Sequence, residues 1–177
     1  MFSTLTRTLA LASCLIAPVL AHMTIENPPV LRAKNNPAYA GGNLIDYSIT
    51  SPLGTSGADF PCKGYHVDLA SGVSKVVTTL QAGSSITVTM SGSATHEGGS
   101  CQFSVSYDRG QTFGVIQSIV GNCPLSSSYT VPLPSNLPAG KDVLFAWTWY
   151  VSCASVHPFN PDTAIIGSTR SVTARCT

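Results

Sequence analysis

The chain has 177 residues, enough for one domain of ordinary size. Its 9 Lys and Arg residues nearly balance 8 Asp and Glu residues, and the formal net charge of +1 gives no reason to expect a nucleic acid or an anionic membrane as a partner. Only 10% of the residues are charged and 44% are hydrophobic, which argues against a disordered chain and against a helical bundle with charged outer faces. With 15 Gly and 12 Pro, the composition predicts a small β-rich domain with many turns.

The first 21 residues are typical of a secretory signal peptide. Arg7 gives a positive start, residues 9–20 are largely apolar, and the small residue Ala21 suits a cleavage site. The apolar run is too short to cross a bilayer, which disfavours the alternative of an uncleaved membrane anchor. We therefore expect a secreted, extracellular protein whose mature chain begins at His22.

A mature chain that begins at His22 has a distinctive capacity to bind a metal ion. Its α-amino group, with an ordinary pKa of about 7.7–8.0, and its imidazole can close a chelate ring around one ion. Imidazole suits copper and zinc. This signal is weak by itself, because some residue must follow every leader peptide.

The next segment, residues 23–65, is dense in Pro, Asn and Gly and should be mostly loop, with short strand or helical pieces. Alternation of apolar and polar residues then predicts strands, separated by turns, at residues 84–91, 102–107, 112–120, 129–133 and 142–150. Such spacing predicts an all-β fold, a β-sandwich with long loops. Trp147 and Trp149 share one face of the last strand, and we interpret them as core residues rather than as a sugar-stacking platform.

These signals divide the chain into a leader at residues 1–21, a sandwich at residues 22–150 and a tail at residues 151–177 whose structure the pattern does not predict. Of the 6 Cys residues, Cys14 would leave with the leader. Export implies disulfides, and the odd number of remaining Cys residues leaves one thiol over or pairs it between chains. No Cys-x-x-Cys occurs, so the spacing is not that of a zinc ribbon.

His96 lies between two predicted strands, in the segment Ala94-Thr95-His96-Glu97-Gly98-Gly99-Ser100-Cys101. It is therefore expected on a loop at one end of the sandwich, where a rigid scaffold often holds binding residues. A solvated surface histidine is the alternative for a lone histidine on a loop. Together with His22, however, it would complete a set of three nitrogen donors that Cu(II) prefers. No Gly-x-Ser-x-Gly motif occurs, and no sequence feature pairs two carboxylates as the acid and base of a glycosidase.

A series of ordered motifs runs through residues 22–150. The series consists of His22 after the leader, Asp59-Phe60-Pro61-Cys62-Lys63, the Ala94-x-His96-x-Gly-Gly-Ser-Cys101-Gln102 loop, Gly121-Asn122-Cys123-Pro124, Leu137-Pro138-Ala139-Gly140 and Phe145-Ala146-Trp147-Thr148-Trp149. Together these motifs resemble fungal lytic polysaccharide monooxygenases, most closely the chitin-active auxiliary activity family 11. The resemblance implies an immunoglobulin-like or fibronectin-like β-sandwich that carries a copper-binding histidine brace.

The resemblance also implies roles for individual residues. His22 would bind copper through its amino group and one ring nitrogen, and His96 would supply the third nitrogen, so both would be catalytic metal ligands. Ala94 matches the small residue that family members place beside the axial position of the copper. Cys101 and Cys123 match a family disulfide. The implied activity is oxidative cleavage of glycosidic bonds in a crystalline polysaccharide, chitin above all, by a secreted monomer that needs an external electron donor and no membrane partner.

The tail departs from the family pattern. Family members follow the aromatic strand with a loop and a further strand of the pattern Arg-Glu-x-Tyr-x-Asn-Cys, which supplies a Glu near the metal, an axial Tyr and a Cys partner for Cys62. Here Tyr150 leads into Val151-Ser152-Cys153-Ala154-Ser155, and no Glu-x-Tyr follows. We expect the missing strand to leave a sheet edge uncovered. The partner of Cys62 stays open between Cys153 and Cys176.

Because the tail departs from the family pattern, two alternative functions stay open. One is a copper-binding or carbohydrate-binding sandwich without turnover, and the other is a plain disulfide-stapled secreted domain with no metal. A further alternative for the tail is that it folds back and places His157 or Phe159 near the metal.

Overall fold

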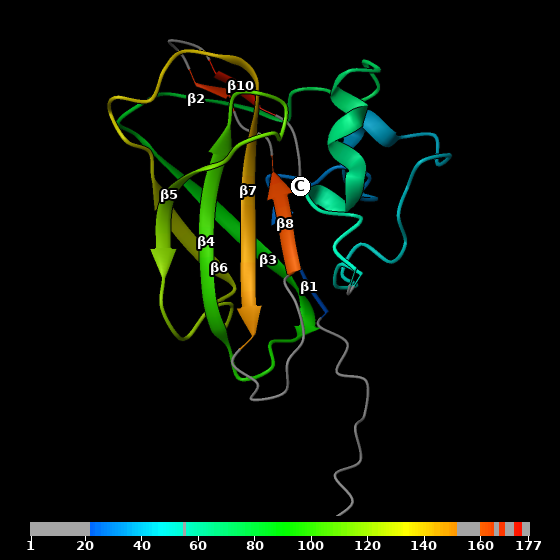
Figure 1. Cartoon of the computed structure of the whole chain (residues 1–177), viewed down its shortest axis with the longest axis vertical. Helices are drawn as coiled ribbons and strands as arrows, with labels where there is room; N and C mark the ends of the chain where they lie inside the picture. Colours follow the sequence, from blue (N-terminus) through cyan, green and yellow to red (C-terminus); the bar gives the residue numbers. More distant parts are fainter. Residues whose placement is uncertain (1–21, 55, 152–159, 165–166, 169–171, 175–177) are drawn as a thin grey trace, which may run out of the picture.

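The structure, a computed structural model, describes residues 22–54, 56–151, 160–164, 167–168 and 172–174. For His22, Val151 and the segments after it, the description is limited to the backbone. The strands form two sheets that face each other across one core, as Figure 1 shows. The predicted all-β sandwich is therefore confirmed.

Alternation builds the smaller sheet. Its central strand, β3 (Ser85–Ala94), buries Ile86, Val88 and Met90 on one face, as its sequence pattern predicts. β3 pairs antiparallel with β1 (His22–Asn27) on one side and with β6 (Ser128–Pro132) on the other.

The larger sheet is built around an antiparallel centre. In spatial order it contains β5 (Gly114–Ile119), β4 (Gly99–Ser106), β7 (Lys141–Val151), β10 (Val172–Ala174), β2 (Thr78–Leu80) and β9 (Gly167–Ser168), and β8 (Asn160–Ala164) also pairs with β7. Two of its pairs, β10 with β7 and β2 with β9, are parallel, and its other pairs are antiparallel.

β7 is buried on both faces. Phe145, Trp147 and Trp149 point into the core and are fully buried, so the interpretation of the two tryptophans as core residues is confirmed. On the opposite face, Leu144 is also fully buried and lies close to Gly110, in the turn after β4. β7 is therefore shielded from water on both sides from Val143 to Trp147, whereas on the outer face of its last residues Thr148 is half-buried and Tyr150 is exposed.

The five strands predicted from alternation are confirmed as β3, β4, β5, β6 and β7, with ends that differ by a few residues. β1, β2 and the strands after residue 151 were not predicted, because they are short and carry no long alternating run. The expectation of an uncovered sheet edge is wrong for the described backbone. β8 lies antiparallel along β7 from Phe145 to Trp149, as Figure 1 shows, so the tail itself supplies the neighbouring strand.

The loop region between β1 and β2 carries two short 3-10 helices, η1 (Pro37–Tyr39) and η2 (Cys62–Leu69). Arg32 donates two hydrogen bonds to the Asp68 carboxylate, at 2.9 and 2.8 Å, and the Tyr39 hydroxyl donates a third at 2.9 Å. Burial would raise the pKa of Asp68, but these hydrogen bonds and the charge of Arg32 hold that pKa below its usual value. The ion pair thus joins the start of this region to η2.

Candidate metal centre

The backbone brings the two predicted histidine ligands to the same end of the sandwich. His22 begins β1 and pairs with Ala94, the last residue of β3, and His96 follows two residues later. Residues paired across antiparallel strands have Cα atoms about 4.5–5.5 Å apart. In Figure 1 the ends of β3 and β7 lie at this same end, close to the start of β1. Ala94 therefore lies opposite His22, and its predicted place beside the metal remains a prediction.

His96 lies in a tight turn. The Gly98 amide donates to the Thr95 carbonyl at 2.8 Å, which closes the turn, and both central residues, His96 and Glu97, have positive φ angles of 47° and 60°. Side chains with a Cβ atom pay a steric cost in this left-handed region. Such strain persists only where the surroundings fix the conformation. Here His96 is half-buried and Glu97 is exposed.

The loop that contains Cys123 holds the base of this turn. Cys101 and Cys123 form a disulfide, as the resemblance implies, so that prediction is confirmed. Closing a loop of 22 residues stabilises the fold by about 3 kcal/mol in the chain-entropy model. The Cys123 amide also donates to the Gly99 carbonyl at 3.3 Å, and the Gly121 amide donates to the Ser100 hydroxyl at 3.2 Å. The backbone just after His96 is therefore tied to a second loop at three points.

Trp149 is a neighbour of His96 that the sequence analysis did not assign to the site. The two ring centroids are 5.9 Å apart, and the ring planes are tilted by 32°. Alternation predicted that Trp149 faces the core, but nothing in the sequence indicates which loop lies over it. The contact depends on the pairing of β4 with β7, which places Cys101 opposite Trp149.

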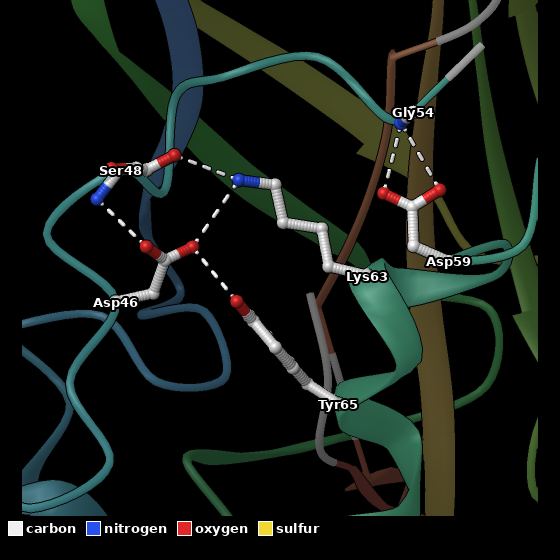
Figure 2. A network of polar contacts seen from close by, with 6 residues as sticks. All are labelled: Asp46, Ser48, Gly54, Asp59, Lys63 and Tyr65. Carbon is white, nitrogen blue, oxygen red and sulfur yellow. Dashed lines mark hydrogen bonds and ion pairs between the residues drawn. The ribbon is translucent and has the colours of Figure 1, made fainter.

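A second polar cluster centres on Asp46, as Figure 2 shows. Its carboxylate accepts from the Lys63 ammonium at 3.2 Å, from the Tyr65 hydroxyl at 2.9 Å and from the Ser48 amide at 2.7 Å. The Arg32 guanidinium lies 4.3 Å from the centroid of the Tyr65 ring, which links this cluster to the Arg32–Asp68 pair. Every charged group of the cluster interacts with another group of the chain. We therefore interpret the cluster as a structural link between the loops. Among the side chains that the structure describes, no three His, Cys, Asp or Glu gather in a metal-binding group.

The Asp46 cluster predicts a loss of stability in alkaline solution. Burial and the hydrogen bond to Asp46 raise the pKa of Tyr65 from 10.0 to about 12. The folded chain then keeps the phenol proton more tightly than the unfolded chain, so this contribution to stability is complete below pH 10 and is lost as the pH rises toward 12. We expect the urea midpoint of the wild type to fall more steeply between pH 9 and about pH 11 than that of Tyr65→Phe. Parallel curves for the two proteins would show that Tyr65 does not cause the loss.

Three curated proteins are similar to this chain, and all three carry the same family name. The AA11 family lytic polysaccharide monooxygenase A of Aspergillus fumigatus is 48% identical over 130 residues, which cover 73% of this chain. The AA11 family lytic polysaccharide monooxygenase of Aspergillus oryzae is 38% identical over 120 residues and 56% of this chain. The AA11 family lytic polysaccharide monooxygenase B of A. fumigatus is 33% identical over 165 residues and 78% of this chain.

This chain is a homologue of the AA11 family lytic polysaccharide monooxygenases. It spans 57%, 27% and 36% of the length of these three relatives, so it corresponds to only part of each. A scan against protein-family models found no match. No helix within the described part of the chain is long and apolar enough to span a membrane.

Several predictions for this AA11 homologue fall outside the described residues. They concern the leader at residues 1–21 and the tail residues Cys153, His157, Phe159 and Cys176. Cys62, whose partner was left open between two of these residues, is buried at the start of η2. Its pairing therefore stays a prediction.

Proposed function

We propose that the mature chain binds one copper ion with His22 and His96 and oxidatively cleaves glycosidic bonds in a crystalline polysaccharide. The substrate that we propose is chitin. The observation that carries the proposal is the pairing of His22 with Ala94, two residues before His96. Family likeness supports the reaction class, because the relative that is 48% identical over 130 residues is named a lytic polysaccharide monooxygenase. We propose further that the protein is secreted, acts as a monomer and takes electrons from an external donor.

The donor atoms suit copper. The proposed ligands are the α-amino nitrogen and a ring nitrogen of His22 and a ring nitrogen of His96, and nitrogen donors of this kind favour Cu(II). The amino group exists only after hydrolysis of the Ala21–His22 peptide bond, so removal of the leader would create the site. His96 is half-buried, which leaves its imidazole accessible to an ion while its contact with Trp149 limits its freedom.

The chain contributes the positioning of the copper ligands rather than acid–base chemistry. Bound copper supplies the oxidation chemistry, in which dioxygen or hydrogen peroxide and external electrons bring about hydroxylation of a carbon at the glycosidic bond. The turn that carries His96 is held by the Cys101–Cys123 disulfide, and the buried Trp149 ring of β7 lies against the His96 ring. A rigid frame of this kind would keep the ligands in place while the polymer lies over the site.

Exposed apolar side chains support a polymeric substrate. Val120 follows β5, which pairs with the start of β4, and its side chain is 87% exposed. Leu125 is 47% exposed and packs against Gly98 in the His96 turn, and Tyr150 is 40% exposed next to Trp149. Apolar and aromatic side chains contact the carbon-bearing faces of sugar rings well. We propose that these residues contact the polysaccharide beside the metal.

The test is release of oxidised oligosaccharides from chitin by copper-loaded chain that begins at His22, in the presence of ascorbate. We expect oxidised products from the wild type and none above background from His96→Ala. Since the tail lacks the Glu-x-Tyr segment, we also expect turnover roughly 10–100-fold below that of a variant whose residues 151–177 are replaced by an ending with the Arg-Glu-x-Tyr-x-Asn-Cys pattern. Mass spectrometry of the soluble products measures both effects under equal copper loading.

The outcomes distinguish three functions. Equal release by the two chains would show that the tail is a working variant. Copper binding without any oxidised product from chitin, cellulose or other polysaccharides would favour the second candidate, a copper-binding or carbohydrate-binding sandwich without turnover, which the absent Glu-x-Tyr segment supports. Absence of copper binding would leave the plain disulfide-stapled domain.

A further inference from the structure

The buried Trp149 indole packs against the His96 imidazole. Trp149 is fully buried near the end of β7, and its ring centroid lies 5.9 Å from that of His96. Its ring also stacks on Trp147, with centroids 6.0 Å apart and planes tilted by only 19°. A side chain packed in this way between a core ring and a loop ring has little room to change rotamer.

The backbone around Trp149 fixes the indole further. β7 is paired on both sides at this residue, with Cys101 of β4 opposite it on one side and Asn160 of β8 on the other. A Cβ atom on Gly99 would lie 3.0 Å from the indole nitrogen, so the backbone just after the His96 turn lies close to the ring. Trp149 is therefore fixed relative to β4, the strand that begins just after the His96 turn.

His96 lies on the turn between β3 and β4. The histidine is half-buried, and its turn places two successive non-glycine residues in the left-handed region. A partly exposed side chain on such a turn would sample several rotamers unless a neighbour restricted it. The His96 ring contacts the ring of Trp149, which is fully buried.

We infer that Trp149 is a positioning residue, whose indole holds the His96 imidazole in one orientation at the end of β3, where His22 begins β1. The inference rests on the proposed function in so far as the imidazole is a copper ligand. A ligand held in place before the ion arrives pays less conformational entropy on binding, so the contact should strengthen copper binding.

Trp149→Phe is a suitable rescue variant. The Trp149 indole N–H is buried and has no hydrogen-bond partner among the described residues. Phe would therefore keep an aromatic ring beside His96 and lose no hydrogen bond. Trp149→Leu removes the aromatic ring. Phe145→Leu is the matched control, because Phe145 is also fully buried on the same face of β7 but stacks on Phe103 instead.

The experiment measures the His96 ring protons by NMR in the metal-free chain that begins at His22, and then the Cu(II) affinity and the electron paramagnetic resonance spectrum of the same variants. We expect Trp149→Leu to shift the His96 ring protons, to lower the Cu(II) affinity roughly 10-fold or more, and to change the copper hyperfine splitting. Trp149→Phe and Phe145→Leu should stay close to the wild type in Cu(II) affinity and hyperfine splitting.

Two results would overturn the inference. One is Trp149→Leu with unchanged His96 ring protons and unchanged Cu(II) affinity, and the other is an equal loss of affinity in Phe145→Leu, which would point to general destabilisation. Failure of the proposed function is recognised separately, because the wild-type chain would then bind no copper whatever the NMR spectrum shows, and the positioning role would fall with it.

Discussion

A chain with one extra residue before His22 should bind Cu(II) roughly 100-fold or more weakly than a chain that begins at His22. The extra residue converts the α-amino group into an amide, which has no basic lone pair to offer a metal ion. Loss of a group that only supports a ligand typically costs about 10–100-fold in metal affinity, so loss of a ligand should reach at least the upper end of that range. Isothermal titration calorimetry measures the difference directly.

The matched control carries the same extra residue at the C-terminus. It has the same added mass and leaves the His22 amine intact, so its affinity should equal that of the chain that begins at His22. Both extended chains should melt at the same temperature without metal, because β1 pairs with β3 through backbone groups that the extension does not remove. Equal Cu(II) affinity in all three chains would reject the histidine brace.

Local patterns predicted the parts of the fold that depend on neighbours in sequence. The alternation of Ile86, Val88 and Met90 gives a strand with one buried face, and the structure has that strand in β3. The prediction that Trp147 and Trp149 are core residues depends on the same two-residue period. These inferences need no knowledge of which strand lies beside which.

The contacts that the sequence did not predict depend on pairing between distant segments of the chain. No periodicity links Arg32 to Asp68, which lies 36 residues away, yet this pair ties the long loop region together. The contact of Trp149 with His96 likewise depends on the register between β4 and β7. The proximity of the two candidate histidines also depends on such pairing, because the register of β1 on β3 places His22 opposite Ala94. The resemblance to a family supplied that proximity in advance, whereas spacing could not.

Register also makes Gly99 a critical residue. Gly99 begins β4 and is paired with Val151 of β7, between the His96 turn and the disulfide-bonded Cys101. A Cβ atom built on Gly99 would collide with the carbonyl oxygen of Tyr150 and would lie 3.0 Å from the indole nitrogen of Trp149. The first of these obstacles is backbone in a paired strand, which cannot rotate away as a flexible side chain can.

Gly99→Ala should therefore destabilise the fold by about 3 kcal/mol, the upper end of the cost of overpacking a core, and should also weaken Cu(II) binding. Relief of the collision requires β4 and β7 to separate where the His96 turn begins, and that movement also shifts Trp149 away from the turn. Gly114→Ala is the matched control, since the nearest atom to its new Cβ would be the Val105 carbonyl oxygen at 3.9 Å. Its effect should stay within about 1 kcal/mol. Urea unfolding and copper titration of both variants measure the difference, and equal stabilities would show that β4 and β7 do not approach so closely at Gly99.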